Sequence, residues 1–389
     1  MSPANALPIP MRALLAGARR KEPSLVELTR RLVLAESPSD SKPAVDACVA
    51  LVSAHAKSLG ARIKLHRQRG YGDIFEARFG PPSGRNNRGP KPILLLGHLD
   101  TVWPLGTLKH MPCRIRNCRL FGPGTLDMKA GVAMALTAIQ MLAETSLLNR
   151  QIVLLLNSDE EIGSTVSRPI TEQIASQCSA VYVLEPAQDL AYKTARKGTG
   201  NWRIEIQGVA AHAGVDFSKG ASALRELARV IDTVSCWTDL KRGLTVSAGL
   251  AGGGSKTNVI PASAWVEFDV RVARKSDGPR IERKFAALTP TDKRCSLTVT
   301  GGINRPPMER TRGTVRLYRQ ARSLAAELGL DLPEAATGGA SDGNFTSALG
   351  VPTLDGMGAV GEGAHAAHES ILIAHLAPRT ALLAALLVQ

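Results

Sequence analysis

A short apolar run that ends in a histidine and an aspartate constrains this chain more than any other stretch. Ile93–Pro104 reads ILLLGHLDTVWP, and its first four residues are all apolar. Such a run is typical of a strand that is buried on both faces of a parallel sheet. His98 and Asp100 follow two residues apart, so in an extended chain their side chains point to the same side. This pair would suit a metal-binding imidazole oriented by a carboxylate, although a structural histidine would look the same.

Two later apolar runs also end in acidic residues. Ile152–Leu156 is followed by the acidic cluster Asp159–Glu161, and Ala180–Leu184 is followed by Glu185. A helical pattern lies between Ile93–Leu96 and Ile152–Leu156. A strand, a helix and a second strand in this order form a βαβ unit, in which the two strands are parallel. Sites in parallel sheets lie beyond the carboxyl ends of the strands. The acidic cluster could also be a solvated surface turn, but adjacent like charges are unfavourable without a compensating cation.

The loop Leu120–Ala130, which reads LFGPGTLDMKA, contributes another acidic residue, Asp127, at the start of the helical pattern. The helix dipole alone would favour a carboxylate there. Imidazoles and carboxylates together, however, suit a zinc-type hydrolytic centre, and a carboxylate shared by two cations suits a two-metal mechanism. Separate segments thus place potential metal ligands at the ends of predicted strands or at the start of the predicted helix. These residues are His98, Asp127, Glu160, Glu161 and Glu185.

The pattern changes character after about residue 193. Trp202, Ile204 and Ile206 alternate with polar residues, as in a half-buried strand, and a helix, two strands, a second helix and a last strand follow. This order, βαββαβ, is typical of a ferredoxin-like unit. We therefore predict an α/β protein with a mostly parallel sheet flanked by helices, formed by residues 1–193 and 306–389. The ferredoxin-like domain is inserted at residues 194–305.

Composition and charge exclude several classes of protein. The 389 residues are 44% hydrophobic and 21% charged, which is typical of a globular protein. The net charge of +14 is spread along the chain, and its densest stretch, Arg310–Arg322, is predicted to be a solvated helix face. With few aromatic residues and no nucleic-acid motif, we expect a basic field that attracts anionic substrates rather than nucleic acid. We find no uninterrupted apolar run of membrane-spanning length and no secretory signal, so we expect a cytoplasmic protein without a membrane partner.

Two further expectations concern the N-terminus and the cysteines. Residues 1–22 are predicted to be a peripheral arm, and Ser24 is predicted to cap the first helix. The cysteines are scattered without zinc-finger spacing, so we predict buried free thiols. They are Cys48, Cys113, Cys118, Cys178, Cys236 and Cys295.

Eight motifs between residues 93 and 369 together resemble one enzyme family. They read GHLDTVWP, GPGTLDMKAG, NSDEEIGS, VLEP, GVAAHAG, SKTNVIPASAWVEFDVR and GGASDGNF followed by GEGAHAAHE. The chain is similar to the co-catalytic zinc family that includes bacterial glutamate carboxypeptidase, acetylornithine deacetylase, succinyl-diaminopimelate desuccinylase and aminoacylase. GPGTLDMKAG, and the VWP that follows HLDT, resemble the glutamate carboxypeptidase branch most.

The resemblance implies a dinuclear centre with two Zn²⁺ ions per chain, for which Co²⁺ or Mn²⁺ could substitute. One ion would be bound by His98 and Glu185 and the other by Glu161 and His365, with Asp127 bridging them. The neighbouring His368 is a second candidate for the place of His365. The GAH context, and the Glu four residues after His365, favour His365.

The resemblance also implies roles outside the ligand set. Glu160 would be the general base, and Asp100 would support His98. The inserted domain would act as a lid and dimerisation domain, in which His212 reaches the partner's active site and stabilises the oxyanion. Asn258 and Arg271 would hold the terminal carboxylate of the substrate. Without the resemblance, these last three would be interpreted as a structural histidine, a turn asparagine and a surface arginine.

The sequence therefore predicts a homodimeric, metal-dependent hydrolase that acts on a small molecule or short peptide. It would cleave an amide bond next to a free-carboxylate amino acid, as a glutamate carboxypeptidase does. An N-acyl-amino-acid deacylase, such as an acetylornithine deacetylase or a desuccinylase, is the alternative. A metal-free relative that only binds ligands is a third possibility. The presence of every implied metal ligand argues against it.

Overall fold

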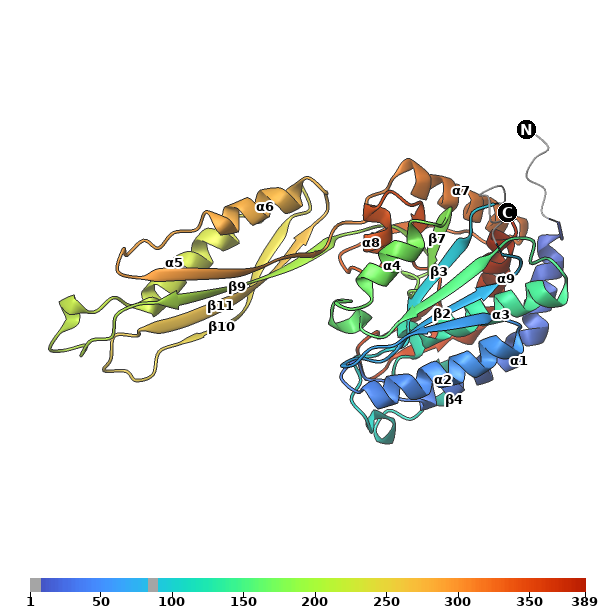
Figure 1. Ribbon diagram of the computed structural model, residues 1–389, viewed down its shortest axis with the longest axis horizontal. Helices are drawn as coiled ribbons and strands as arrows, with labels where there is room; N and C mark the ends of the chain where they lie inside the picture. Colours follow the sequence, from blue (N-terminus) through green and yellow to red (C-terminus); the bar gives the residue numbers. More distant parts are fainter. Residues whose placement is uncertain (1–7, 83–89) are drawn as a thin grey trace. The chain divides into compact units, whose positions relative to one another are not determined.

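The chain folds into two units, which are described separately (Figure 1). The computed structural model describes residues 8–82 and 90–389. Unit 1 consists of Met1–Ala195, Arg310–Ala336 and Ser341–Gln389, and unit 2 consists of Arg196–Glu309 and Thr337–Ala340. Unit 2 thus interrupts unit 1 in sequence.

Unit 1 is built on a six-stranded sheet with the order β1-β2-β6-β3-β7-β14. β3 runs parallel to β6 and β7, and β14 runs parallel to β7, whereas β2 is antiparallel to β1 and β6. Every residue of β3 and β6 is buried, which explains their continuous apolar runs. The predicted, mainly parallel sheet is confirmed. Its strands are β1 (Arg62–His66), β2 (Ile74–Phe79), β3 (Ile93–His98), β6 (Ile152–Asn157), β7 (Ala180–Val183) and β14 (Thr353–Leu354).

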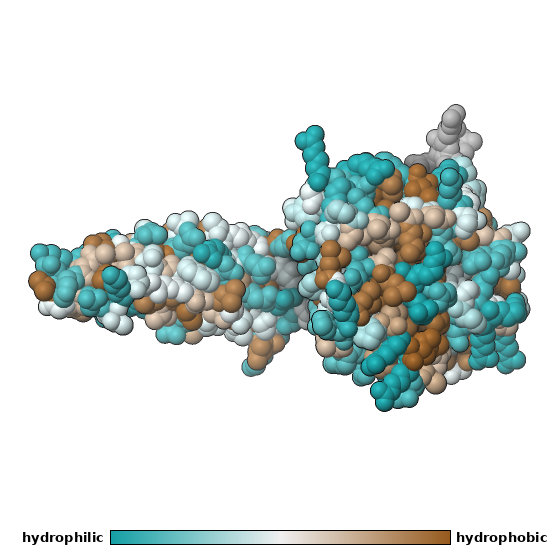
Figure 2. Space-filling model, turned by 90° about the horizontal axis from the view of Figure 1, so that it is seen from below, coloured by the Kyte–Doolittle hydropathy of each residue, from teal (hydrophilic) through white to brown (hydrophobic). Residues whose placement is uncertain are grey.

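Helices cover both faces of this sheet. Leu95 of β3 belongs to an apolar cluster shared with α1, α2, α3, α7 and α9, whereas Leu94 and Leu96 point into another cluster, shared with α4. Figure 2 shows hydrophobic residues interspersed with hydrophilic ones on the visible face of unit 1. The helices of unit 1 are α1 (Met11–Leu34), α2 (Lys42–Ser58), α3 (Ala130–Glu144), α4 (Arg168–Ala175), α7 (Arg312–Glu327), α8 (Gly343–Ala348) and α9 (Leu376–Leu387).

α3 and the turn before it form the one helical stretch among the described residues that is both long and apolar enough to span a membrane. By length and composition Thr125–Glu144 could cross a membrane, but 83% of its apolar window is buried inside the protein. α3 packs against α1 and α9. The stretch is therefore a core helix of unit 1, and polar residues within it interrupt the apolar run.

Two predictions about local structure are wrong. α1 begins at Met11, so the predicted arm is helical from that residue; residues 1–7 lie outside the described part of the chain. Met11, Leu14 and Ala18 are buried at helical spacing and extend the apolar face of the helix. Ser24 is not an N-cap, because it lies inside α1, where its hydroxyl donates to the carbonyl of Lys21 (2.8 Å).

The cysteines are free, as predicted, but only some of them are buried. Burial raises the pKa of the Cys48 and Cys178 thiols. Cys118 and Cys236 are exposed and Cys113 is half-buried, so the prediction of burial is wrong for these three. A cysteine on a surface loop carries no sequence signal that distinguishes it from a core thiol.

Unit 2 is a four-stranded antiparallel sheet with two helices on one face. Its order, β10-β11-β9-β12, and the chain order βαββαβ are those of a ferredoxin-like domain, which confirms the predicted inserted fold. Trp202 stacks on Phe285 in its core, with ring centroids 4.4 Å apart. The elements are β9 (Gly198–Gln207), α5 (Ala223–Ser235), β10 (Thr245–Gly253), β11 (Ser263–Val272), α6 (Asp277–Ala286) and β12 (Ser296–Arg305).

A small sheet in unit 1 joins two loops that are distant in sequence. Its order is β15-β16-β5-β4, and β16 pairs antiparallel with β5. This pairing brings the loop that follows β15 next to the loop that follows β5. The strands are β4 (Arg114–Arg116), β5 (Arg119–Phe121), β15 (Gly361–Glu362) and β16 (Ser370–Leu372), and a separate pair is formed by β8 (Tyr192–Arg196) and β13 (Glu334–Thr337).

Candidate metal centre

The predicted ligands of unit 1 lie at the carboxyl ends of neighbouring strands. His98 is the last residue of β3, Glu160 and Glu161 lie in a short turn, η4 (Glu160–Ile162), that follows β6, and Glu185 follows β7. β3 lies between β6 and β7 and is parallel to both. The three strands therefore deliver these side chains to one edge of the sheet, where sites form in parallel sheets.

His98 is buried and oriented by the residue two positions later. Its Nδ1 lies 2.9 Å from the backbone carbonyl oxygen of Asp100 and 3.5 Å from Oδ1 of the same residue. Its Nε2 faces Oδ1 of Asp127 at 3.3 Å and Oε1 of Glu185 at 3.6 Å. An Nδ1–H donated to the carbonyl leaves Nε2 as the ligand atom, directed at the carboxylates.

The side chain of Asp100 mainly orders the backbone of the acidic turn. Its carboxylate accepts hydrogen bonds from the backbone N–H of Glu160 (3.2 Å) and of Glu161 (3.1 Å). The hydroxyl of Ser39 donates to the same carboxylate at 2.7 Å. Asp100 thus supports His98 through its carbonyl and both glutamates through its side chain.

Asp127 lies between the two histidines. Its Oδ1 faces Nε2 of His98, and its Oδ2 lies 3.4 Å from Nε2 of His365. His365 Nε2 also lies 3.3 Å from Oε2 of Glu161. Asp127 does not lie in the first turn of α3 but in the preceding irregular turn η3 (Thr125–Lys129), with non-helical φ and ψ. One carboxylate thus presents an oxygen to each imidazole, as a bridging ligand would.

The third acid of the cluster has a different environment. Asp159 is buried, and its carboxylate accepts the backbone N–H of Val166 at 2.8 Å. Burial raises the pKa of Asp159 despite this bond. Asp159 therefore orders the loop that follows η4, while Glu160 and Glu161 are directed toward His98 and His365.

The charges of the centre depend strongly on one another. Burial opposes the charge on His98, but hydrogen bonds with Asp100 and Asp127 raise its pKa well above the usual value. Hydrogen bonds with Asp127 and Glu161 raise the pKa of His365 to about 10. Burial opposes ionisation of Asp127, but bonds with both histidines lower its pKa. Cations that bind here would replace protons on the imidazoles.

The donor set fits divalent metal ions of the zinc type. Ligand atoms of His98, Asp127 and Glu161 lie within 4.8 Å of one another, and so do those of His98, Glu160 and Glu185. Imidazole nitrogens and carboxylate oxygens are the ligands of such ions in hydrolytic sites. Oε1 of Glu161 is buried without a hydrogen-bond partner among the described residues. A buried oxygen of this kind requires an explanation, and a bound cation would supply one.

Glu369 is a residue whose role sequence reasoning missed. In the sequence, Glu369 only helps to distinguish His365 from His368. In the structure, its buried carboxylate binds the loop that carries Asp127. It accepts hydrogen bonds from the backbone N–H of Gly124 (2.9 Å), Leu126 (2.8 Å) and Asp127 (3.0 Å), and from the indole of Trp103 (2.9 Å). Glu369 thus couples the segment of His365 to the orientation of Asp127.

Replacing Glu369 by glutamine is expected to weaken metal binding by roughly 10- to 100-fold, as loss of a partner that orients metal ligands usually does. The amide nitrogen cannot accept the backbone N–H groups that the carboxylate accepts. Competition with a chromophoric chelator measures the affinity. Glu362→Gln is the matched control, because Glu362 is exposed and pairs with Arg119 on the same small sheet. Equal affinity of Glu369→Gln and wild type would contradict the positioning role.

The remaining predicted residues, His212, Asn258 and Arg271, belong to unit 2. Nδ1 of the exposed His212 accepts the backbone N–H groups of Gly214 and Val215, each at 3.1 Å. The neutral ring therefore carries its proton on Nε2. Asn258 lies beside this loop, since its carbonyl accepts the N–H of Ala213 (3.0 Å). Arg271 forms a two-point pair with Asp269 through Nε and Nη2, each at 2.8 Å.

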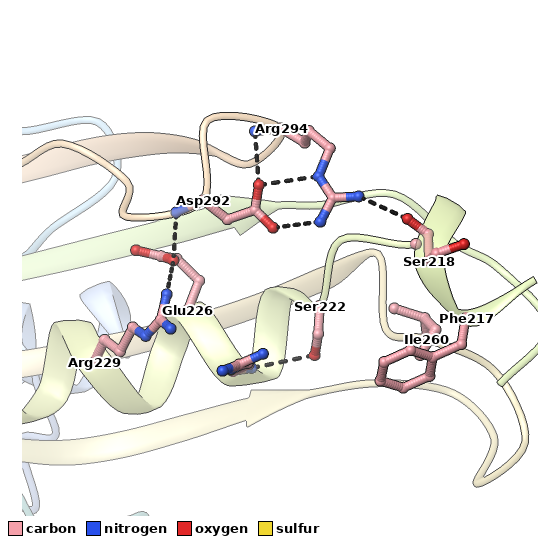
Figure 3. A pocket seen from close by; sticks show the side chains of 10 residues that line it. Phe217, Ser218, Ser222, Glu226, Arg229, Ile260, Asp292 and Arg294 are labelled. Carbon is pink, nitrogen blue, oxygen red and sulfur yellow. Dashed lines mark hydrogen bonds and ion pairs between the residues drawn. The ribbon is translucent and has the colours of Figure 1, made fainter.

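Unit 2 also contains a pocket of about 340 Å³ next to the start of α5 (Figure 3). Its charged side chains are largely paired with one another. Arg294 forms a two-point pair with Asp292, and Arg229 lies 3.6 Å from buried Glu226. The pocket contains none of the predicted metal ligands, which all lie in unit 1.

Comparison with known proteins identifies relatives of the whole chain. Residues 94–389 match the family model described as peptidase family M20/M25/M40. The chain is 28% identical over 385 residues to carboxypeptidase G2 of Pseudomonas sp. (strain RS-16), covering 96% of this chain and 91% of that protein. It is 27% identical over 333 residues to succinyl-diaminopimelate desuccinylase of Acidovorax ebreus (strain TPSY), covering 79% and 82%.

Among solved structures, the fold is similar to that of aminopeptidase PepT from Bacillus cereus ATCC 10987. The TM-score is 0.79 at 22% sequence identity, and the match covers 94% of this chain and 98% of that one. The likeness extends over both units and supports the α/β fold with its inserted domain.

Proposed function

Because the chain belongs to peptidase family M20/M25/M40, a family of metal-dependent hydrolases, we propose that it cleaves the amide bond next to a free-carboxylate amino acid, as a glutamate carboxypeptidase does. The observation that carries this proposal is the placement of Asp127 between the imidazoles of His98 and His365. The similarity to carboxypeptidase G2 along nearly the whole chain supports the choice of reaction.

The proposed centre holds two metal ions, with zinc as the expected identity and cobalt or manganese as substitutes. His98 and Glu185 would hold one ion, Glu161 and His365 the other, and Asp127 both. When bound, the ions would supply Lewis acidity that makes a water molecule acidic near neutral pH and polarises the scissile carbonyl. The observed contacts of Asp127 with both histidines support this division of ligands.

Glu160 is the proposed general base. Its backbone N–H is fixed by Asp100, and its side chain is directed toward His98 and Glu185. It would take a proton from the attacking water and later deliver the proton to the leaving nitrogen. The same carboxylate would thus act as a base while water attacks, and as an acid while the amine nitrogen leaves.

Unit 2 would supply the groups that bind the substrate. The proton on Nε2 of His212 makes this atom a donor for the oxyanion, and in the proposed homodimer it would act in the partner's active site. Arg271 would hold the terminal carboxylate of the substrate, since Nη1 takes no part in its pair with Asp269. Asn258 would help Arg271 to bind this carboxylate. Its backbone carbonyl accepts a hydrogen bond from Ala213 in the loop of His212.

The similarity to a succinyl-diaminopimelate desuccinylase favours a second candidate, an N-acyl-amino-acid deacylase. Both reactions hydrolyse an amide bond in a molecule with a free carboxylate. They differ in the acyl group that leaves the site, and therefore in the pocket that accepts it.

A substrate panel with metal-loaded protein tests the proposed function. We expect hydrolysis of an N-blocked peptidyl-glutamate to exceed that of N-acetylornithine and N-succinyl-diaminopimelate, and we expect a chelator to abolish it. Faster hydrolysis of either N-acyl substrate would select the deacylase instead. No hydrolysis of any member of the panel by fully metallated protein would favour a ligand-binding relative.

A further inference from the structure

One face of α7 consists of arginines, which we call the arginine face: Arg312, Arg316, Arg319 and Arg322. They follow one another at intervals of four, three and three residues, so they lie on one side of the helix over about 15 Å. All four are exposed. The opposite side of α7 packs into unit 1 through residues such as Leu317, Tyr318 and Ala321. Figure 1 shows α7 within unit 1.

Few acidic side chains offset the charge of this face among the described residues. The neighbouring Arg310 forms a two-point pair with Glu334, through Nε and Nη2, each at 2.8 Å. Among the described residues, however, no carboxylate forms an ion pair with any member of the arginine face. Like charges at such spacing destabilise a helix by a few tenths of a kcal/mol per pair. A solvated helix face, which the sequence predicted here, usually mixes both signs of charge.

The arginine face borders a surface groove of about 480 Å³. The groove is lined by Arg310, Arg312, Val315, Arg316 and Arg319. Its volume is within the range of small-molecule sites. Three of its four guanidinium groups have no acidic partner among the described residues, so an occupant with at least three negative charges would balance them. Guanidinium forks match phosphate oxygens in pairs, which a lysine ammonium does not.

We propose that the groove beside the arginine face binds a compact polyphosphate anion, either a nucleoside triphosphate or inorganic tripolyphosphate. Three closely spaced phosphate groups would meet Arg312, Arg316 and Arg319 along about two turns of the helix. The groove is formed by Arg310–Arg319 alone and shares no residue with the metal centre. The proposal therefore does not depend on the proposed hydrolase function.

Calorimetric titration of the full-length, metal-loaded protein with sodium tripolyphosphate at low ionic strength tests the proposal. We expect one anion per chain and an affinity that falls as salt is added. Arg316→Gln combined with Arg319→Gln should weaken binding roughly 100-fold, at about tenfold for each lost charged contact. Arg280→Gln with Arg283→Gln is the matched control, because these arginines are exposed on α6 in unit 2. Circular dichroism confirms that each variant is folded.

Titrations with other anions distinguish a nucleotide site from a site for the phosphate chain alone. ATP that binds more tightly than tripolyphosphate would identify a nucleotide site, and equal affinities would identify a site for the phosphate chain alone. Arg316→Lys with Arg319→Lys should bind with intermediate affinity, because the charge remains but the forks are lost. No binding to wild type, or equal binding to wild type and the glutamine variant, would overturn the proposal. Binding of only a single-stranded oligonucleotide would overturn it too and would indicate nucleic acid.

Discussion

Replacing Glu160 by glutamine is expected to lower turnover by roughly 10²–10⁴-fold, the usual loss when a general acid–base is removed, without loss of metal. Glutamine keeps the size of the side chain, and the backbone N–H of residue 160 can still donate to Asp100. The amide cannot take a proton from water. Turnover of the best substrate in the panel and elemental analysis of the same protein sample measure the two quantities.

Glu161→Gln is the matched variant, one residue away in the same turn. Oε2 of Glu161 lies 3.3 Å from Nε2 of His365, and Oε1 is buried without a hydrogen-bond partner among the described residues. This variant should lose metal affinity, and excess metal should restore part of its activity. If Glu160→Gln lost metal and Glu161→Gln retained it, the two glutamates would have exchanged roles.

Mixing two inactive variants is expected to restore about one quarter of wild-type activity if His212 acts across a dimer. His212→Ala should bind metal normally and turn over roughly 10²–10³-fold more slowly, because one oxyanion donor is lost. When this variant is unfolded and refolded with an equal amount of Glu160→Gln, about half of the dimers are mixed. Each mixed dimer has one site with both defects and one with neither.

The refolded mixture must be dimeric and fully metallated before its activity is interpreted. Each parent refolded alone is the control and should stay inactive. A site built within one chain gives no recovery, because each chain carries a defect of its own. A dimeric, metallated mixture that stays as inactive as its parents would show that His212 does not act on the partner.

The sequence predicts the parallel sheet, and also the edge of the sheet at which the site lies, because buried strands have a strong sequence signal. Ile93–Leu96 and Ile152–Leu156 have no polar residue, and this is the condition for burial on both faces. Once the two runs are parallel, the residues after them must lie at one edge of the sheet. His98 and the acids after β6 are brought together for this reason.

The contacts that hold the site could not be predicted, because they join segments that are distant in the sequence. Glu369 accepts backbone N–H groups more than 240 residues away, and such bonds have no periodic signal. The backbone role of Asp100 was missed for the same reason, since it binds the N–H groups of residues 160 and 161. The early start of α1 was missed because Pro23 lies inside the helix, where proline usually marks a boundary.

Elemental analysis of gently purified protein is the direct test for a two-metal hydrolytic centre around Asp127. We expect about two transition-metal ions per chain, with zinc as the main element, and about one or fewer in Glu161→Gln. Protein that contains no transition metal and takes up neither zinc nor cobalt would contradict this expectation.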